Sequence, residues 1–136
     1  QKRSVPINHE QIIKYAKYRA PMNNVTSMFK LDKYLKSGGY DNVRFMEDYR
    51  LFYKFLNNGS KFHNLEDVLV DVRNNNDRIN RYKGIKYFKR EYSFFLELLS
   101  KKNINLFQFF INIIIRFIVR ILPNVIIIKI YKILRR

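Results

Sequence analysis

The sequence predicts an α/β domain followed by a basic helical tail, and three observations support this prediction. Helical apolar spacings alternate with short β-branched runs over the first 77 residues. Four polar residues, Asn74 to Asp77, then interrupt the pattern. From Arg78 onward the apolar residues recur at helical spacing only. We therefore predict a domain over residues 1–77 and a helical tail over residues 78–136.

Length and charge restrict the possible classes of protein. The 136 residues are enough for one modest hydrophobic core, and the absence of cysteine excludes disulfides and thiolate metal sites. The net charge is +16, and the tail holds 14 Lys and Arg against two Glu, whereas residues 1–77 hold 13 basic against nine acidic residues. A positive field concentrated in the tail favours an anionic surface, either nucleic acid or acidic lipid.

The first 39 residues predict a helix, a strand and a second short helix. The first helix extends from Asn8 to about Arg19, because Pro21 disfavours the helical conformation at the residue before it. Val25–Leu31 is predicted to be a strand because it is moderately hydrophobic and begins with a β-branched residue. Asp32 is expected to cap a helix that the Gly38-Gly39 pair ends.

An acidic pair then begins the most regular helical pattern of the domain. After Glu47 and Asp48 the apolar residues follow helical spacing as far as Asn57-Asn58-Gly59, a strong helix stop. Beyond this stop, Lys61–Leu65 and Val68–Val72 are predicted to form short strands.

The acidic pair has two interpretations. Both carboxylates suit the first helical turn, where the macrodipole stabilises negative charge by roughly 0.3 to 1 kcal/mol each. Alternatively, one carboxylate faces a cleft as a general base, and the Gly38-Gly39 turn lets the backbone approach a substrate closely.

The segments around this pair carry a specific resemblance. Four stretches are concerned: Arg19 to Phe29, Gly38-Gly39-Tyr40, Glu47 to Leu51, and Val68 to Arg73. Together with the basic tail, they resemble the C-terminal half of bacterial family 2 glycosyltransferases of the capsule and exopolysaccharide type. In that family an Arg-Asn-Pro-x-Asn-His-x-Thr segment precedes a strand, Gly-Gly-Tyr follows, and an acidic pair supplies the catalytic base.

The resemblance implies a GT-A-like fold and assigns roles by position. Asp48 would be the general base, and Glu47 would be its neighbour in the acceptor site. The other substrate-binding positions would be Gly38, Gly39, Tyr40, Asn23, Thr26 and Arg73. For Asn23 and Thr26 the alternative to substrate binding is a hydrogen bond to backbone. For Arg73, Arg81 and Lys83 the alternative to contact with a diphosphate is a solvated face. For His63 the alternative to a role as ligand is a structural role.

Two departures from the family pattern concern polar positions and the donor site. This chain has Ala20 and Asn24 where the family has Asn and His. No Asp-x-Asp motif occurs in the 136 residues. We expect the complete enzyme to use Mg or Mn with ligands outside this chain, and we expect the chain to be inactive alone.

The tail predicts a helix from Arg78 to about Lys102, a second over Ile104–Leu122 and a third after Pro123. The second helix gathers its polar residues into one narrow stripe: Asn105, Gln108, Asn112, Arg116 and Arg120. Charged residues within it disfavour a membrane span. We predict an in-plane anchor whose Phe and Ile face enters the acyl boundary, while Arg116, Arg120, Lys129 and Lys132 meet anionic headgroups. A hairpin packed on another protein surface is the alternative, and the long isoleucine runs disfavour nucleic acid.

The sequence therefore predicts the acceptor-site part of an inverting glycosyltransferase. It would transfer a sugar from a nucleotide-sugar donor to a lipid-linked saccharide in surface polysaccharide biosynthesis, at the cytoplasmic face of the bacterial inner membrane. The alternative function is a basic membrane-binding or assembly module without chemistry of its own, the remnant of a split gene.

Overall fold

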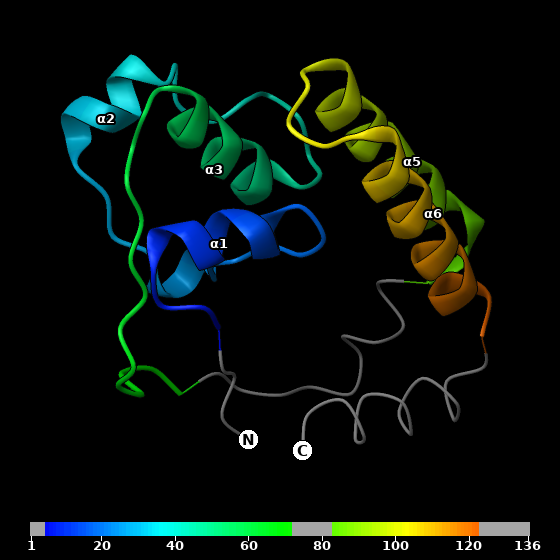
Figure 1. Ribbon diagram of the computed structural model, residues 1–136, viewed down its shortest axis with the longest axis horizontal. Helices are drawn as coiled ribbons and strands as arrows, with labels where there is room; N and C mark the ends of the chain where they lie inside the picture. The colour runs from blue at the N-terminus through cyan, green and yellow to red at the C-terminus, as the bar shows by residue number, and fades with distance from the viewer. Residues whose placement is uncertain (1–4, 72–82, 123–136) are drawn as a thin grey trace. The chain divides into compact units, whose positions relative to one another are not determined.

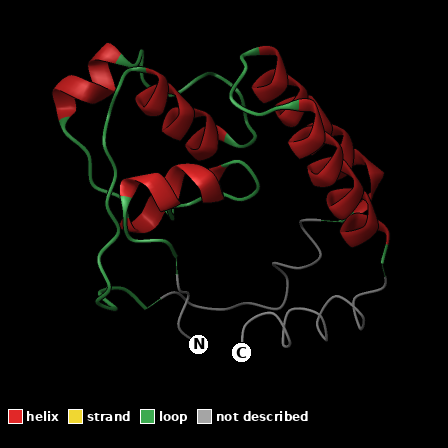
Figure 2. Ribbon diagram, viewed as in Figure 1, coloured by secondary structure: helices red, strands yellow, loops and turns green. Residues whose placement is uncertain are grey.

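The computed structural model describes residues 5–71 and 83–122 (Figure 1). The chain divides into two compact units, Gln1–Val70 and Asp71–Arg136. Every regular element in the described ranges is a helix, as the colours of Figure 2 show. The predicted α/β class is therefore wrong for these residues, although the helices were largely predicted. The predicted boundary after residue 77 lies outside the described residues.

The first unit contains three α-helices and one 3-10 turn. These are α1 (His9–Ala16), η1 (Asn24–Thr26), α2 (Leu31–Lys36) and α3 (Glu47–Asn57). The core of the unit is built by α1 and α3, which bury one face each. The buried residues are Ile12 and Ala16 of α1 and Tyr49, Leu51, Phe52, Tyr53 and Phe55 of α3. Helical spacing in the sequence predicted most of this buried face, but Leu56 is only half-buried and Tyr53 was not predicted.

Two tyrosines of α3 fasten the end of α1. The hydroxyls of Tyr49 and Tyr53 both donate to the backbone oxygen of Ala16, the Tyr53 bond at 2.8 Å. Burial raises the pKa of the Tyr53 phenol well above its ordinary value. The two hydroxyls satisfy a carbonyl that the end of α1 leaves open.

Helices α2 and α3 end as the sequence predicted. At the end of α2, the backbone N–H of Gly38 donates to the carbonyl of Leu35, and the backbone N–H of Gly39 donates to the carbonyl of Tyr34. This is the bonding pattern of a Schellman motif. Gly38 and Gly39 adopt φ values of 76° and 63°. Both glycines are in the left-handed region, where residues with a Cβ are strained. The sharp turn that follows leads directly into Tyr40.

The predicted strand Val25–Leu31 is wrong. Its first residues lie in η1, where the side chains of Thr26 and Ser27 both donate to the backbone oxygen of Asn23. Such local side-chain bonds compete with the pairing of a strand. The last residue of the predicted strand, Leu31, begins α2, and Asp32 lies in the first turn while Lys30 occupies the cap position.

The predicted strands Lys61–Leu65 and Val68–Val72 are also wrong where they are described. Lys61–Leu65 forms no strand and is held by Asn64. The backbone N–H of Asn64 donates to the carbonyl of Ile7 at 3.1 Å, and its side-chain NH₂ donates to the carbonyl of Pro6 at 2.6 Å. Residues 68–71 are irregular, and Val72 lies outside the described residues. An apolar-rich composition is insufficient here because a strand also needs a partner strand, and Lys61–Leu65 is instead held to Pro6 and Ile7 through Asn64.

The second unit is a helical hairpin. Helix α5 (Gly84–Ser100) and helix α6 (Leu106–Ile121) pack against each other. Lys102 adopts the left-handed conformation at the end of α5. Asn105 caps α6 through a reciprocal bond pair with Gln108. Both predicted tail helices are confirmed within the described residues, whereas residues 78–82 and the helix predicted after Pro123 lie outside them.

Candidate functional site

A pocket of about 520 Å³ lies in the first unit, beside the start of α3. Its wall is largely apolar and aromatic, with Phe29, Phe52, Phe55 and Phe62 among the lining residues. Its charged lining residues are Asp48 and three lysines: Lys30, Lys33 and Lys61. A single carboxylate among lysines suits a ligand that carries negative charge and also a group able to give a proton to Asp48.

Asp48 reaches this pocket from the first turn of α3. Partial burial, and then the negative charge of Glu47, raise the pKa of the Asp48 carboxyl above its ordinary value. A macrodipole acting alone would favour the ionised form and lower this pKa. A raised pKa brings a carboxylate closer to the value that suits a general base near neutral pH.

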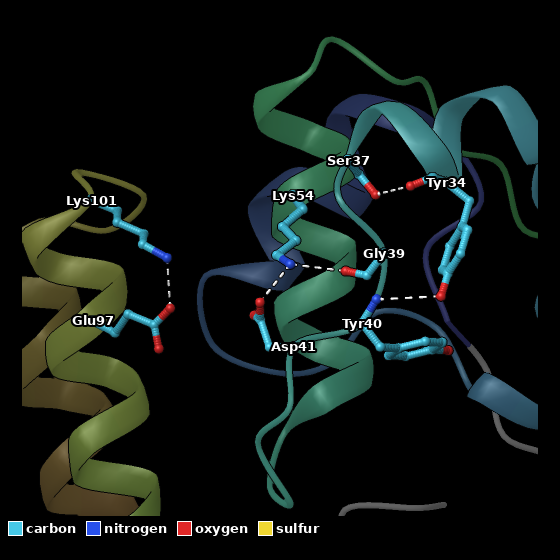
Figure 3. Close-up of polar contacts among 8 residues, drawn as sticks. All are labelled: Tyr34, Ser37, Gly39, Tyr40, Asp41, Lys54, Glu97 and Lys101. Atoms are coloured by element: carbon cyan, nitrogen blue, oxygen red, sulfur yellow. Dashed lines mark hydrogen bonds and ion pairs between the residues drawn. The ribbon is translucent and has the colours of Figure 1, made fainter.

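The loop after α2 places Tyr40 at the same pocket. The ammonium of Lys54 donates to the Gly39 carbonyl at 2.9 Å and pairs with Asp41 at 2.6 Å, so that both ends of the loop are tied to α3 (Figure 3). The Tyr40 hydroxyl donates to the side chain of Asn24 at 3.0 Å. Burial, and then the charge of Asp48, raise the pKa of the Tyr40 phenol. Tyr40 is thus a neutral hydroxyl that Asp48 acts on electrostatically.

The structure brings some of the predicted site residues together. Asp48, Tyr40 and His63 line the pocket. Gly38 and Gly39 shape the turn that precedes Tyr40. The remaining predicted residues of this unit, Glu47, Asn23 and Thr26, are outside the pocket lining. Thr26 bonds to the backbone of Asn23, which is the structural alternative stated above. Arg73 and Arg81 lie outside the described residues.

Sequence reasoning missed several residues of this site. Asn24 stands at one of the two departures from the family pattern, yet it lines the pocket and bonds Tyr40. Lys54 follows Arg50 by one helical turn, which indicated a shared polar face of α3. Nothing in the sequence showed that the Gly39 to Asp41 loop returns to that face.

The polar stripe of α6 faces α5. Glu91 of α5 is 2% exposed, and its carboxylate accepts two bonds from Arg120, at 2.7 and 2.8 Å. Arg116 lies 3.6 Å from the same carboxylate. The guanidinium groups of Arg116 and Arg120 also lie over the rings of Phe95 and Tyr87. The predicted placement of both arginines on a lipid-facing surface is therefore wrong, because they bind Glu91 inside the hairpin. Lys129 and Lys132 lie outside the described residues.

The described ranges contain neither a cluster of metal-binding side chains nor a helix that could cross a membrane. In residues 5–71 and 83–122, no group of three or more His, Cys, Asp or Glu side chains is arranged to hold a metal ion. Over the same ranges, no helix combines the length and hydrophobicity that crossing a bilayer requires.

The chain is similar in sequence to bacterial glycosyltransferases. It is 38% identical over 121 residues to UDP-Gal:alpha-D-GlcNAc-diphosphoundecaprenol beta-1,3-galactosyltransferase of Escherichia coli, covering 86% of this chain and 42% of that protein. It is 29% identical over 119 residues to the amylovoran biosynthesis glycosyltransferase AmsE of Erwinia amylovora, covering 88% of this chain and 45% of AmsE. An uncharacterized glycosyltransferase of Haemophilus influenzae is 31% identical over 131 residues, 96% of this chain and 48% of that protein.

The similarity extends over most of this chain but only part of each relative. The chain spans less than half the length of the curated relatives it matches. No family model matches the chain. No solved structure matches it either. The relatives therefore support the predicted resemblance to polysaccharide glycosyltransferases, and the part of them that the chain represents remains a prediction.

Proposed function

We propose that the chain is the acceptor-side part of an inverting glycosyltransferase of family 2, with a GT-A-like fold, that builds a surface polysaccharide. The observation that supports this most directly is Asp48, a carboxylate of raised pKa at an apolar pocket with three lysines. The names of the relatives, two of which state a sugar polymer or a sugar-lipid substrate, point to the same class of reaction.

The proposed chemistry is a single displacement. Asp48 accepts the proton of an acceptor hydroxyl while that oxygen attacks the anomeric carbon of a nucleotide sugar. The bond between this carbon and the nucleotide diphosphate breaks, and the diphosphate leaves with the electron pair. One displacement inverts the anomeric centre. A positioned general base accelerates such a step roughly 10²- to 10⁴-fold.

The acceptor is proposed to be a saccharide joined to a lipid through a diphosphate. Lys30, Lys33 and Lys61 line the pocket and provide positive charge for the diphosphate. The aromatic wall suits the apolar faces of sugar rings or the first part of a lipid chain. The donor and a divalent metal, Mg or Mn, would be held by residues outside the described part of the chain.

Exposed apolar residues in the first unit support the proposal that more protein packs on it. Val25 is 73% exposed, Met28 94% and Leu69 69%, and all three lie in segments whose composition predicted strands. Exposed apolar runs of this kind mark surfaces for other protein or for ligands. A nucleotide-binding part that added strands beside these segments would bury them.

The decisive experiment is Asp48→Asn in a protein that contains this chain and a nucleotide-binding part. We expect sugar transfer to fall roughly 10²- to 10⁴-fold while nucleotide binding is unchanged. The matched control is Asp32→Asn, because Asp32 also lies in a first helical turn but is outside the pocket lining. Equal turnover of the Asp48 variant and the wild type would refute the assignment of the base.

Acceptor binding can be measured on the 136-residue chain itself. Calorimetric titration with a short-tailed saccharide-diphospho-lipid should show binding that Lys33→Gln weakens several-fold. Lys36→Gln changes a lysine of the same helix that is outside the pocket lining and should have no effect. Tight, metal-dependent binding of a nucleotide sugar to the chain alone would contradict our expectation that the chain is inactive by itself.

The alternative function, a membrane-binding module without chemistry, is favoured by one observation in the second unit. Large apolar side chains of α6 are exposed, whereas Asn112 is buried and Arg116 and Arg120 turn toward Glu91. This arrangement does not conflict with the glycosyltransferase proposal and has consequences of its own.

A further inference from the structure

The α5–α6 hairpin buries Glu91 and Asn112 among apolar side chains such as Phe94, Phe95 and Phe109, and α6 leaves a broad apolar surface exposed. Asn112 is 2% exposed, and Arg120 binds the buried Glu91. The outward residues of α6 are 49% to 71% exposed: Phe107, Phe110, Ile114, Ile118 and Ile121. A surface helix of a globular protein normally shows the opposite polarity.

The outward residues of α6 form one continuous stripe, the α6 apolar face. Their spacings of three, four, four and three residues place them on one side of a helix with 3.6 residues per turn. The polar stripe that includes Asn112, Arg116 and Arg120 lies on the opposite side, toward Glu91. The α6 apolar face therefore points away from α5.

Helix α5 extends this apolar surface at one edge and carries positive charge elsewhere. Phe88 packs edge-on against the partly exposed Phe117 of α6, with ring centroids 5.2 Å apart. The side chains of Lys86, Lys89 and Arg90 are exposed on the same helix. Residues 83–122 hold eight Lys and Arg against two Glu, and an exposed apolar helix face on a positively charged unit matches the profile of a membrane interface with anionic headgroups.

The charges inside the hairpin are compatible with such a location. Glu91 is neutralised by a bidentate guanidinium, and Arg116 lies close by. Paired and buried charges present no isolated ion to lipid. A helix of 16 residues is about 24 Å long, shorter than the roughly 30 Å hydrocarbon core, so it suits the interface plane better than a span.

We propose that the α6 apolar face inserts into the acyl boundary of an anionic bilayer, with α6 parallel to the surface and Glu91, Arg116 and Arg120 joining it to α5. This inference stands independently of the proposed transferase reaction. It keeps the apolar contact of the anchor predicted from the sequence, but Arg116 and Arg120 bind Glu91 and do not serve as the headgroup contacts.

Vesicle flotation with the 136-residue chain tests this proposal. The double variant Phe110→Glu with Ile114→Glu should bind vesicles of phosphatidylcholine and phosphatidylglycerol at least about tenfold more weakly than the wild type, because two apolar contacts are lost. The matched control is Val25→Glu with Leu35→Glu, which makes the same charge change at exposed apolar residues of the first unit. The control should retain binding to within a few-fold.

A second measurement does not depend on the stability of the double variant. The chain has no cysteine, so Ile114→Cys can carry a single environment-sensitive fluorophore. Its emission should shift to shorter wavelength when vesicles are added, whereas the same label at Leu35→Cys should not respond.

Three outcomes would overturn the proposal. One is equal flotation of the two double variants. Another is the absence of a spectral shift at residue 114. The third is a dimer in sedimentation that the α6 variant dissociates, without any vesicle binding, since a second copy of the chain would then cover the α6 apolar face.

Discussion

The two units of this chain use amphipathic helices in opposite senses. In the first unit, α3 buries its aromatic residues and leaves Asp48 exposed at a pocket. In the second unit, α6 buries Asn112 and leaves its isoleucines exposed. Both helices have the same period in the sequence, because the period records only that apolar and polar residues occupy different sides. Which side faces the protein depends on what the neighbouring helix offers.

In the second unit, Glu91 of α5 determines which side of α6 faces the protein. A buried carboxylate requires a cationic partner within the fold, and α6 supplies Arg116 and Arg120. In the first unit, the buried acceptor is the backbone oxygen of Ala16, which two tyrosine hydroxyls satisfy. Aromatic residues are buried in both units, but in the second unit the buried charge also draws Arg116 and Arg120 inward, and a large part of the apolar surface of α6 stays outside.

The largest expected effect comes from breaking the buried contact of Glu91 with Arg116 and Arg120 in the second unit. Glu91→Gln leaves two guanidinium groups without their carboxylate, and we expect the hairpin to lose about 3 to 5 kcal/mol of stability. Native-state hydrogen exchange of the α5 and α6 amides measures this without interference from the first unit. The control Glu97→Gln makes the same substitution on another side of α5, where Glu97 forms an exposed pair with Lys101 at 2.7 Å (Figure 3). This variant should lose less than about 1 kcal/mol of stability. Equal losses in the two variants would remove the special role of Glu91.

A smaller effect is expected at the turn of the first unit. A Cβ at residue 39 would lie 2.9 Å from the ring of Tyr34, and the residue has positive φ. Gly39→Ala should therefore cost about 2 to 4 kcal/mol in urea unfolding, from strain and overpacking together. Gly38→Ala meets no atom within 4 Å, so it should cost only the strain of a left-handed alanine, about 1 to 2 kcal/mol. A Gly38 variant as unstable as the Gly39 variant would contradict the contact with Tyr34.

The smallest effect concerns the pH dependence of the first unit. Because the pKa of Asp48 is higher in the folded protein than its ordinary value of 3.8, the folded state binds more protons, and stability falls as pH rises through this window. Asp48→Asn removes that loss. The variant should gain stability relative to wild type between about pH 3 and pH 7, by less than about 1 kcal/mol because the carboxylate is largely solvated.

Thermal unfolding at several pH values measures this gain. Glu47→Gln is the companion variant, since removal of that charge should lower the Asp48 pKa in a carboxyl NMR titration. An unchanged pKa in this variant would leave burial as its only cause.

Local signals in the sequence were sufficient for helices and insufficient for strands. Two helix ends were predicted correctly, at Gly38-Gly39 and at Asn57-Asn58-Gly59, because these residues favour a turn whatever surrounds them. A strand requires a partner, and Val25–Leu31 has none in the described residues. Its Thr26 and Ser27 side chains bond locally instead.

The candidate site was predicted in part for the same reason. Asp48 and Tyr40 stand in recognisable segments, so their positions followed from the resemblance. Asn24 and Lys54 act across 16 and 13 residues of chain, on Tyr40 and Asp41. Such contacts depend on how the loop folds back, which the spacing of residues does not record.

The bond between Glu91 and Arg120 also fixes the register of the hairpin. The two residues are 29 positions apart, and the bidentate bond permits one alignment of α5 against α6. A slide by one helical turn, about 5.4 Å, would move Arg120 out of reach of Glu91. The two helices are thereby held in one register, so a displacement of the outer surface of α6 also displaces α5. Motion of the hairpin against any surface is then expected to be that of a single body.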